Sequence, residues 1–116
     1  MCNEGELKNI TDNITKASKD IFSERLNKVI LYGSYARGEN SEYSDIDIMI
    51  IVDMPANDLL PFRKMIDQIA SDLSLETDDC VTVSATLQDN ETFSRYKEVL
   101  PYYRNVLSDG VVLYAA

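Results

Sequence analysis

Histidine is absent from this sequence of 116 residues, and cysteine occurs only at Cys2 and Cys80. Zinc sites are built mainly from histidine and cysteine at short spacings, so the sequence contains no zinc-site pattern. The beginning of the chain has none of the basic and apolar features of a secretion signal, which favours a cytosolic protein. We therefore expect two free thiols rather than a disulfide, because disulfides are rare in the cytosol.

Basic residues are scarce as well, with 11 lysines and arginines against 20 aspartates and glutamates and a net charge of −9. Nucleic-acid backbones are bound by clustered lysine and arginine side chains, and no such cluster is visible. We therefore expect no direct contact with nucleic acid, although a nucleotide held through a metal ion is compatible with this charge. The acidity also favours a basic protein as a partner, by electrostatic attraction.

Long apolar runs are missing too, and the longest is far too short to span a bilayer as a helix. Hydrophobic residues make up 45% of the chain and charged residues 27%, which is typical of a globular protein. A chain of this length can bury one hydrophobic core but not a second. We expect a single domain over residues 1–116, located in the cytoplasm and not associated with a membrane.

The most informative stretch is 29–52, where two apolar segments flank a polar turn. Residues 29–32 predict a buried strand, and a second strand is expected over 45–52. Successive side chains of a strand point to opposite faces, so Asp45 and Asp47 lie on one face, about 6.5–7 Å apart at the backbone. Carboxylate oxygens are the natural ligands of hard cations, so this pair can hold one or two Mg²⁺ ions.

The turn between these two strands carries groups suited to a phosphate. Gly33 has no side chain, so a phosphate can approach its backbone closely. Ser34 offers a hydroxyl and a backbone N–H at the start of a short helix, where anions are favoured, and Arg37 adds a positive charge one turn on. These phosphate-binding groups lie beside the paired carboxylates, an arrangement that can bind a nucleoside triphosphate through a metal ion. The alternative is a strand–turn–strand whose two aspartates face solvent at a sheet edge.

These two motifs, GSYARG at 33–38 and SDID at 44–47, resemble the signature of the polymerase-β-like nucleotidyltransferase superfamily. Their spacing and the chain length are most similar to its minimal (MNT) branch, the small partners of HEPN-domain proteins. The resemblance implies a nucleotidyltransferase fold in which Asp45 and Asp47 are catalytic and bind the metal, while Gly33, Ser34 and Arg37 bind the nucleotide.

The resemblance also implies a third catalytic carboxylate on the next strand. Asp79 is the nearest candidate, with Asp78 behind it, but here both acids precede the apolar stretch. If the strand is shifted, Thr82 occupies the position that faces the aspartate pair, and the site lacks one carboxylate. A further alternative is that Asp78 and Asp79 only form a polar beginning to the strand.

The remaining elements are predicted from hydrophobic periodicity and from capping residues. Asn3 and Glu6 form a capping pattern at the start of the first helix, and Asp89 is a suitable N-cap for a later one. The helix that follows Asp89 is expected to end at Pro101 and to have an apolar face formed by Phe93, Tyr96, Val99 and Leu100. The helix before it is expected to have an apolar face formed by Leu59, Phe62, Met65, Ile66, Ile69, Ala70 and Leu73. The expected helices are 4–22, 57–75, one that follows Asp89, and 102–107; the further strands are 78–87 and 111–114.

This order of elements predicts an α/β (α+β) fold, a small mixed β-sheet with helices packed on one face. Tyr96, Tyr102 and Tyr103 form a cluster that suits either base stacking or, more simply, packing or a protein interface, where tyrosine is enriched.

The function predicted from these features is nucleotidyl transfer that depends on Mg²⁺ and a nucleoside triphosphate, with ATP preferred. The nucleotidyl group, AMP in that case, would pass to a hydroxyl on a HEPN-like helical protein, with this chain as the antitoxin of the pair. One alternative is a binding subunit that neutralises its partner by occlusion alone, and another is an antibiotic-modifying transferase, disfavoured by the small size. The chain could also form homo-oligomers, and the sequence does not give its oligomeric state.

Overall fold

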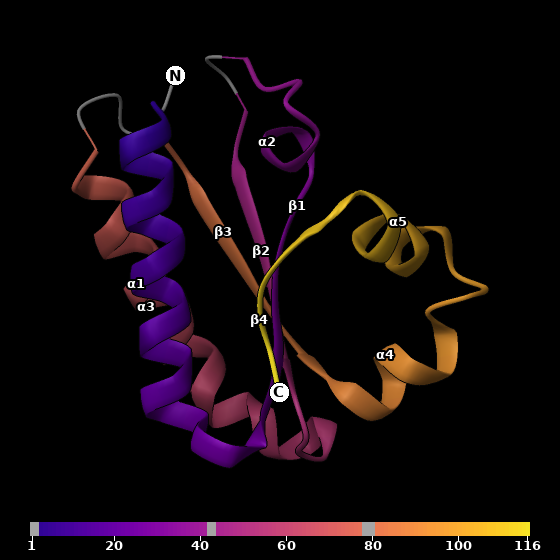
Figure 1. Cartoon of the computed structure of the whole chain (residues 1–116). Coiled ribbons are helices and arrows are strands. Elements are labelled where there is room, and N and C mark those ends of the chain that lie inside the picture. Colours follow the sequence, from indigo (N-terminus) through magenta and orange to yellow (C-terminus); the bar gives the residue numbers. More distant parts are fainter. Residues whose placement is uncertain (1–2, 42–43, 78–80) are drawn as a thin grey trace.

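A computed structural model describes residues 3–41, 44–77 and 81–116 of the chain (Figure 1). Cys2 and Cys80 lie outside these residues, so the expected free thiols stay a prediction. No helix within the described ranges is long and apolar enough to cross a membrane. The elements are, in chain order, α1 (Glu4–Phe22), the 3-10 helix η1 (Ser23–Arg25), β1 (Leu26–Tyr32), α2 (Ser34–Arg37), β2 (Ile46–Val52), the 3-10 helix η2 (Ala56–Leu59), α3 (Leu60–Leu75), β3 (Val83–Asp89), α4 (Asn90–Tyr96), α5 (Pro101–Asp109) and β4 (Val111–Ala115).

The four strands form one mixed sheet in the order β3-β2-β1-β4, which confirms the expected fold class. β1 pairs antiparallel with both β2 and β4, whereas β2 and β3 are parallel. Antiparallel neighbours can be joined by a short connection, and α2 with its loop joins β1 to β2. A parallel pair needs a crossover, which α3 supplies between β2 and β3.

One face of the sheet is covered by α1 and α3 (Figure 1). Ile48 and Ile50 of β2 point into this core, where Ile14 of α1 and Ile66 of α3 are also almost fully buried. Each such side chain contributes about 1.5–3 kcal/mol by leaving water. This larger core holds in place the strands that carry the candidate site.

The other face of the sheet is covered by α4 and α5, so helices lie on both faces and not on one as expected (Figure 1). Met49 and Ile51 of β2 lie on the same face as the aspartates, and both are completely buried. They pack in a second, smaller core with Phe93 of α4 and Val106 of α5. The physical reason is visible in the β2 sequence, because its two final residues on that face are apolar and need cover.

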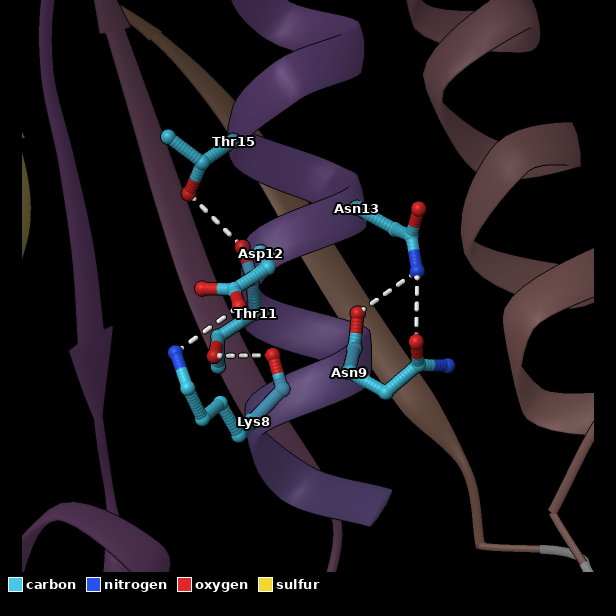
Figure 2. Close-up of polar contacts among 6 residues, drawn as sticks. All are labelled: Lys8, Asn9, Thr11, Asp12, Asn13 and Thr15. Atoms are coloured by element: carbon cyan, nitrogen blue, oxygen red, sulfur yellow. Dashed lines mark hydrogen bonds and ion pairs between the residues drawn. The ribbon is translucent and has the colours of Figure 1, made fainter. Parts of the chain in front are cut away.

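The first helix agrees with its prediction at both ends, since α1 spans Glu4–Phe22. The Asn3 side chain accepts a hydrogen bond from the Glu6 backbone and the Glu6 side chain accepts one from the Asn3 backbone, which completes the capping box. Polar side chains along α1 make contacts about one turn apart (Figure 2). These contacts are Lys8 Nζ to Asp12 Oδ2 at 2.9 Å, Asn13 Nδ2 to the Asn9 carbonyl at 2.8 Å and Thr15 Oγ1 to the Thr11 carbonyl at 2.7 Å.

Two expected apolar faces are wrong in part. Met65 of α3 is 48% exposed, although Ile66 and Ala70 beside it are buried as predicted. The helix that follows Asp89 ends at Tyr96 and does not continue to Pro101. Val99 and Leu100 therefore leave the helical face and are exposed. Asp89 itself caps α4, since its carboxylate accepts a hydrogen bond from the Thr92 backbone at 2.8 Å.

Candidate active site

The connection between β1 and β2 brings the glycine turn against the second aspartate. Gly33 follows the last residue of β1 and has φ +79°, a left-handed conformation that L side chains rarely adopt. A Cβ atom added there would lie 2.5 Å from Asp47 Oδ2, closer than real Cβ atoms approach other atoms. The Asp47 carboxylate therefore lies directly against the Gly33 backbone. Glycine is required here by both the conformation and the contact.

The aspartate pair lies at the mouth of β2, on the expected face. Asp45 directly precedes the strand and is exposed, whereas Asp47 within the strand is half-buried. The pKa of Asp47 is raised above its ordinary value, first by burial and then by repulsion from Asp45, while Arg37 opposes the rise. A carboxylate pair with this repulsion is stabilised by any cation that binds between its oxygens.

The short helix α2 holds the two other predicted nucleotide ligands. Ser34 is its first residue, directly after Gly33, and its carbonyl accepts a hydrogen bond from the Glu39 backbone at 2.9 Å. Arg37 is its last residue and donates from Nε to Glu39 Oε2 at 3.1 Å. The Arg37 side chain is 41% exposed and that of Glu39 is 69% exposed, so the ion pair contributes little stability and leaves the guanidinium available to an anion.

The third strand presents hydroxyl groups to the aspartate pair. In the parallel pairing of β2 with β3, Asp47 lies opposite Ser84, and the Ile46 backbone donates to the Thr82 carbonyl at 2.9 Å. Thr82 and Ser84 are both exposed beside the carboxylates. Within the described part of β3, the positions on this face are Ser84, Thr86 and Gln88, none of them acidic. Asp79, the expected third catalytic acid, lies outside the described residues together with Asp78, so its role stays a prediction.

A layer of tyrosines covers the face directly behind the aspartate pair. Tyr32 of β1 is the cross-strand partner of Asp47, so the two side chains lie on the same face of the sheet. The Tyr32 hydroxyl forms a hydrogen bond of 2.8 Å with the Tyr102 hydroxyl of α5. Burial, followed by this hydrogen bond and by the charge of Asp47 among smaller causes, raises the pKa of Tyr102, while Thr86 opposes the rise.

The donor set of the pair fits a magnesium ion. Asp45 and Asp47 supply the carboxylate oxygens that Mg²⁺ prefers, and Mg²⁺ usually takes only one or two carboxylates together with substrate phosphates. In the described ranges no group of three or more acidic, cysteine or histidine side chains could hold a metal ion. The remaining ligands would therefore come from the substrate, from water or from residues outside those ranges.

Four of the six predicted site residues are thus linked. The Gly33 backbone lies against the Asp47 carboxylate, and the charges of Asp45 and Arg37 act on the pKa of Asp47. Ser34 adjoins them through the chain itself. Sequence reasoning missed Tyr32 and assigned Tyr102 mainly to packing, because the two residues are 70 positions apart and only the folded sheet brings them together. The available signal was the tyrosine immediately before the glycine turn, on the face that the strand period assigns to Asp47.

Comparisons with known proteins identify relatives of this chain. The sequence profile of the nucleotidyltransferase domain matches residues 12–111. A protein of Methanocaldococcus jannaschii, named provisionally as a protein adenylyltransferase, is 39% identical over 98 residues, which cover 84% of this chain and 88% of the relative. A second protein of that organism with the same provisional name is 40% identical over 74 residues, covering 63% of this chain and 72% of the relative.

Solved structures share the fold at low sequence identity. A protein from Sulfolobus solfataricus, described provisionally as a nucleotidyltransferase, has a TM-score of 0.57 at 22% identity and covers 94% of this chain and 79% of its own. A structure of the toxin–antitoxin MntA–HpeT has a TM-score of 0.54 at 18% identity, and the match covers 91% of this chain and 73% of that one. A toxin–antitoxin structure with AMP-PNP has a TM-score of 0.52 at 19% identity and covers 90% and 73%. With the profile match across most of its length, the chain belongs to the nucleotidyltransferase domain family.

Proposed function

We propose that this nucleotidyltransferase transfers AMP from ATP to a hydroxyl on a partner protein, in a reaction that depends on Mg²⁺. The observation that carries the proposal is the contact between the Gly33 backbone and the Asp47 carboxylate, with Asp45 and Arg37 beside it. Phosphate-binding groups and metal-binding groups therefore adjoin each other, which is the arrangement that a metal-bound triphosphate needs.

Each residue of the site has a distinct role in this proposal. Gly33 has no side chain, which leaves room for the Asp47 carboxylate and brings the metal-binding pair against the nucleotide loop. The Gly33 backbone and the Ser34 hydroxyl would contact a phosphate there. Arg37 exchanges its exposed contact with Glu39 for a phosphate oxygen, which costs little because exposed ion pairs are weak. Asp45 and Asp47 hold Mg²⁺, which when bound neutralises phosphate charge and aligns the attacking oxygen.

The transfer exchanges the phosphoanhydride bond between the α- and β-phosphates of ATP for a phosphate ester bond to the acceptor. The oxygen of the acceptor hydroxyl attacks the α-phosphorus of ATP, and the bond from that phosphorus to the bridging oxygen breaks. Pyrophosphate leaves with the bond electrons, and the hydroxyl proton passes to a base. Asp45 and Asp47 are assigned to the metal, so the proposed base is Asp79, a role that the family resemblance implies.

Several observations support ATP as the donor and a protein as the acceptor. The relatives from M. jannaschii carry provisional names as protein adenylyltransferases. Two structures with the same fold are toxin–antitoxin structures, and one of them was crystallised with AMP-PNP. The chain itself has a net charge of −9, which favours a basic partner, and we propose a HEPN-like helical protein in that role.

Titration calorimetry with ATP tests the binding half of the proposal. Mg²⁺ is expected to tighten ATP binding at least about tenfold for the wild type, because the ion links the phosphates to the carboxylates. Asp45→Asn combined with Asp47→Asn is expected to lose this gain while remaining folded. The matched control is Asp58→Asn, an exposed aspartate in η2 beyond the opposite end of β2. Equal Mg²⁺ gains in all three proteins would refute the assignment of the metal ligands.

Intact-mass measurement tests the transfer half. The chain is incubated with the product of a neighbouring gene, ATP and Mg²⁺, and both proteins are weighed. A gain of one or more AMP units on the partner, lost in Asp45→Asn, is the expected result.

A second function is favoured by one observation, the hydroxyls of Thr82 and Ser84 where a third acid would complete the site. This function is neutralisation of the partner by occlusion alone. Its signature is that Asp45→Asn neutralises the partner as well as the wild type does, with no change of mass in either protein.

A further inference from the structure

The aromatic layer on the aspartate face begins directly behind the carboxylates. Asp47 lies between Tyr32 on β1 and Ser84 on β3, and the next row on the same face of the sheet is Ile30, Met49 and Thr86. Tyr102 of α5 reaches this boundary, because its hydroxyl forms a hydrogen bond with the Tyr32 hydroxyl. The Thr86 side chain is also near enough to affect the pKa of Tyr102. Tyr102 is therefore the side chain of the covering layer that borders the candidate site.

The Tyr102 ring is held in position and yet remains accessible. It forms T-shaped contacts with two neighbouring rings, with centroid distances of 5.9 Å to Tyr32 and 5.5 Å to Tyr103. Tyr103 is anchored in turn by an edge contact with Phe93 at 5.3 Å and by a hydrogen bond to Gln88 at 3.0 Å. Despite these contacts Tyr102 is 48% exposed, whereas Met49 beneath the layer is completely buried. A fixed aromatic ring with an open surface is suited to stacking.

We propose that Tyr102 forms the wall of the site against which the nucleobase of the bound nucleotide packs, with Tyr32 holding its ring in place. This inference rests on the proposed function, because it takes the triphosphate to lie at Gly33 and the aspartate pair. The α-phosphate carries the nucleoside, so the base extends from the carboxylates over a neighbouring surface. Tyr102 supplies an aromatic surface there, and base–aromatic stacking contributes about 1–3 kcal/mol per base by alanine substitution.

The surroundings of Tyr102 favour a role in stacking by its ring over a role as a nucleophile by its hydroxyl. Nucleophilic attack by a tyrosine requires loss of its hydroxyl proton, and burial with a neighbouring carboxylate disfavours the charged phenolate. Its hydroxyl is also already engaged with Tyr32. Stacking uses the ring and leaves both of these contacts unchanged.

Fluorescence offers a direct test because the chain contains no tryptophan. Tyr102→Trp places one indole at the wall, and Tyr96→Trp places one at the end of α4, an element remote from α2 (Figure 1). With Mg²⁺ present, ATP is expected to quench the indole at position 102 saturably. Tripolyphosphate, which has no base, is expected to bind without this change, and neither ligand should alter the indole at position 96. Equal responses to the two ligands at position 102, or none although ATP binds, would overturn the proposal.

Affinity measurements on a second set of variants separate the ring from the hydroxyl. Tyr102→Ala is expected to weaken ATP binding about tenfold or more and to change tripolyphosphate binding less than twofold, since only ATP has a base to stack. Tyr102→Phe keeps the ring but loses the hydrogen bond to Tyr32, so it should weaken ATP binding less than Tyr102→Ala does. Thermal unfolding of each variant confirms that it folds.

The two proposals fail in distinguishable ways. If Tyr102→Ala lowers both affinities by the same factor, or neither, Tyr102 has only a structural role and the base lies elsewhere, while the triphosphate site stands. If the wild type binds neither ATP nor tripolyphosphate in the presence of Mg²⁺, the proposed function is wrong and the stacking wall is overturned with it.

Discussion

Gly33 illustrates how a single residue can serve both the fold and the site. Two separate constraints act on it, a positive φ and the close approach of Asp47. Gly38, at the other end of α2, has φ +71° but nothing within 4 Å of an added Cβ. Gly38 is therefore a natural control, because it shares the first constraint and lacks the second.

We expect Gly38→Ala to lower the free energy of unfolding by about 1 kcal/mol, the cost of a left-handed conformation for an L side chain. Gly33→Ala should cost about 2 kcal/mol or more, because its Cβ also displaces the Asp47 carboxylate. Only Gly33→Ala should abolish the Mg²⁺-dependent gain in ATP affinity. Urea unfolding and calorimetry measure the two effects, and equal losses in both variants would show that the Asp47 contact is unimportant.

Asp47 is a site residue that the fold holds at a cost. Its pKa is raised in the folded chain, mainly by burial, so the protonated form is favoured relative to the unfolded chain. The free energy of unfolding therefore rises as the pH falls through the raised pKa and Asp47 becomes protonated. Above that pKa, the ionised Asp47 lowers the free energy of unfolding. At neutral pH the carboxylate is destabilising unless a cation is bound.

Asp47→Asn should consequently raise the melting temperature of the metal-free protein at pH 7. The expected gain is about 0.5 kcal/mol, or about 2–4 °C, because the half-buried side chain is partly screened by solvent. Asp58→Asn removes the same charge at an exposed position and corrects for the net charge of −9. Added Mg²⁺ should stabilise the wild type and not Asp47→Asn. A melting temperature that falls in Asp47→Asn would contradict this account.

At the scale of elements, the features that depend on local periodicity could be predicted from the sequence. The period of two in β2 placed Asp45 and Asp47 on one face, and the capping residues Asn3 and Asp89 marked the starts of α1 and α4. The same period placed Met49 and Ile51 beside the aspartates. The expectation of helices on one face overlooked that these two apolar residues need the cover that α4 and α5 provide.

Features that depend on pairing between distant segments could not be predicted in the same way. The register of β3 against β2 is set by how α3 packs, and a shift of one residue would turn each β3 side chain to the opposite face. It decides that Ser84 lies opposite Asp47. Likewise, the contact of Tyr32 with Tyr102 depends on α5 returning across the sheet, which no local pattern encodes.

For the whole molecule, the two faces of the sheet are unequally stabilised. The α1 and α3 face holds most of the buried side chains, whereas the α4 and α5 face has the small core around Phe93 and Val106. Leu107 of α5 is exposed, and so are Val99 and Leu100 between α4 and α5. Segments with fewer buried apolar contacts open at lower free energy than the global unfolding of the protein.

Native-state hydrogen exchange is therefore expected to show α4 and α5 opening below the global free energy of unfolding. Their amides should exchange at least about tenfold faster than those of β2, a difference of about 1.4 kcal/mol. The amides of α1 and α3 serve as internal controls, because these helices should exchange close to the rate of β2. If the Tyr102 wall contacts the nucleobase, ATP with Mg²⁺ should slow exchange in α5 more than tripolyphosphate does. If α5 and β2 exchange at one common rate, the sheet and both its helical layers unfold as a single unit. If nucleotide does not change that rate, the Tyr102 wall is already rigid before any nucleotide binds.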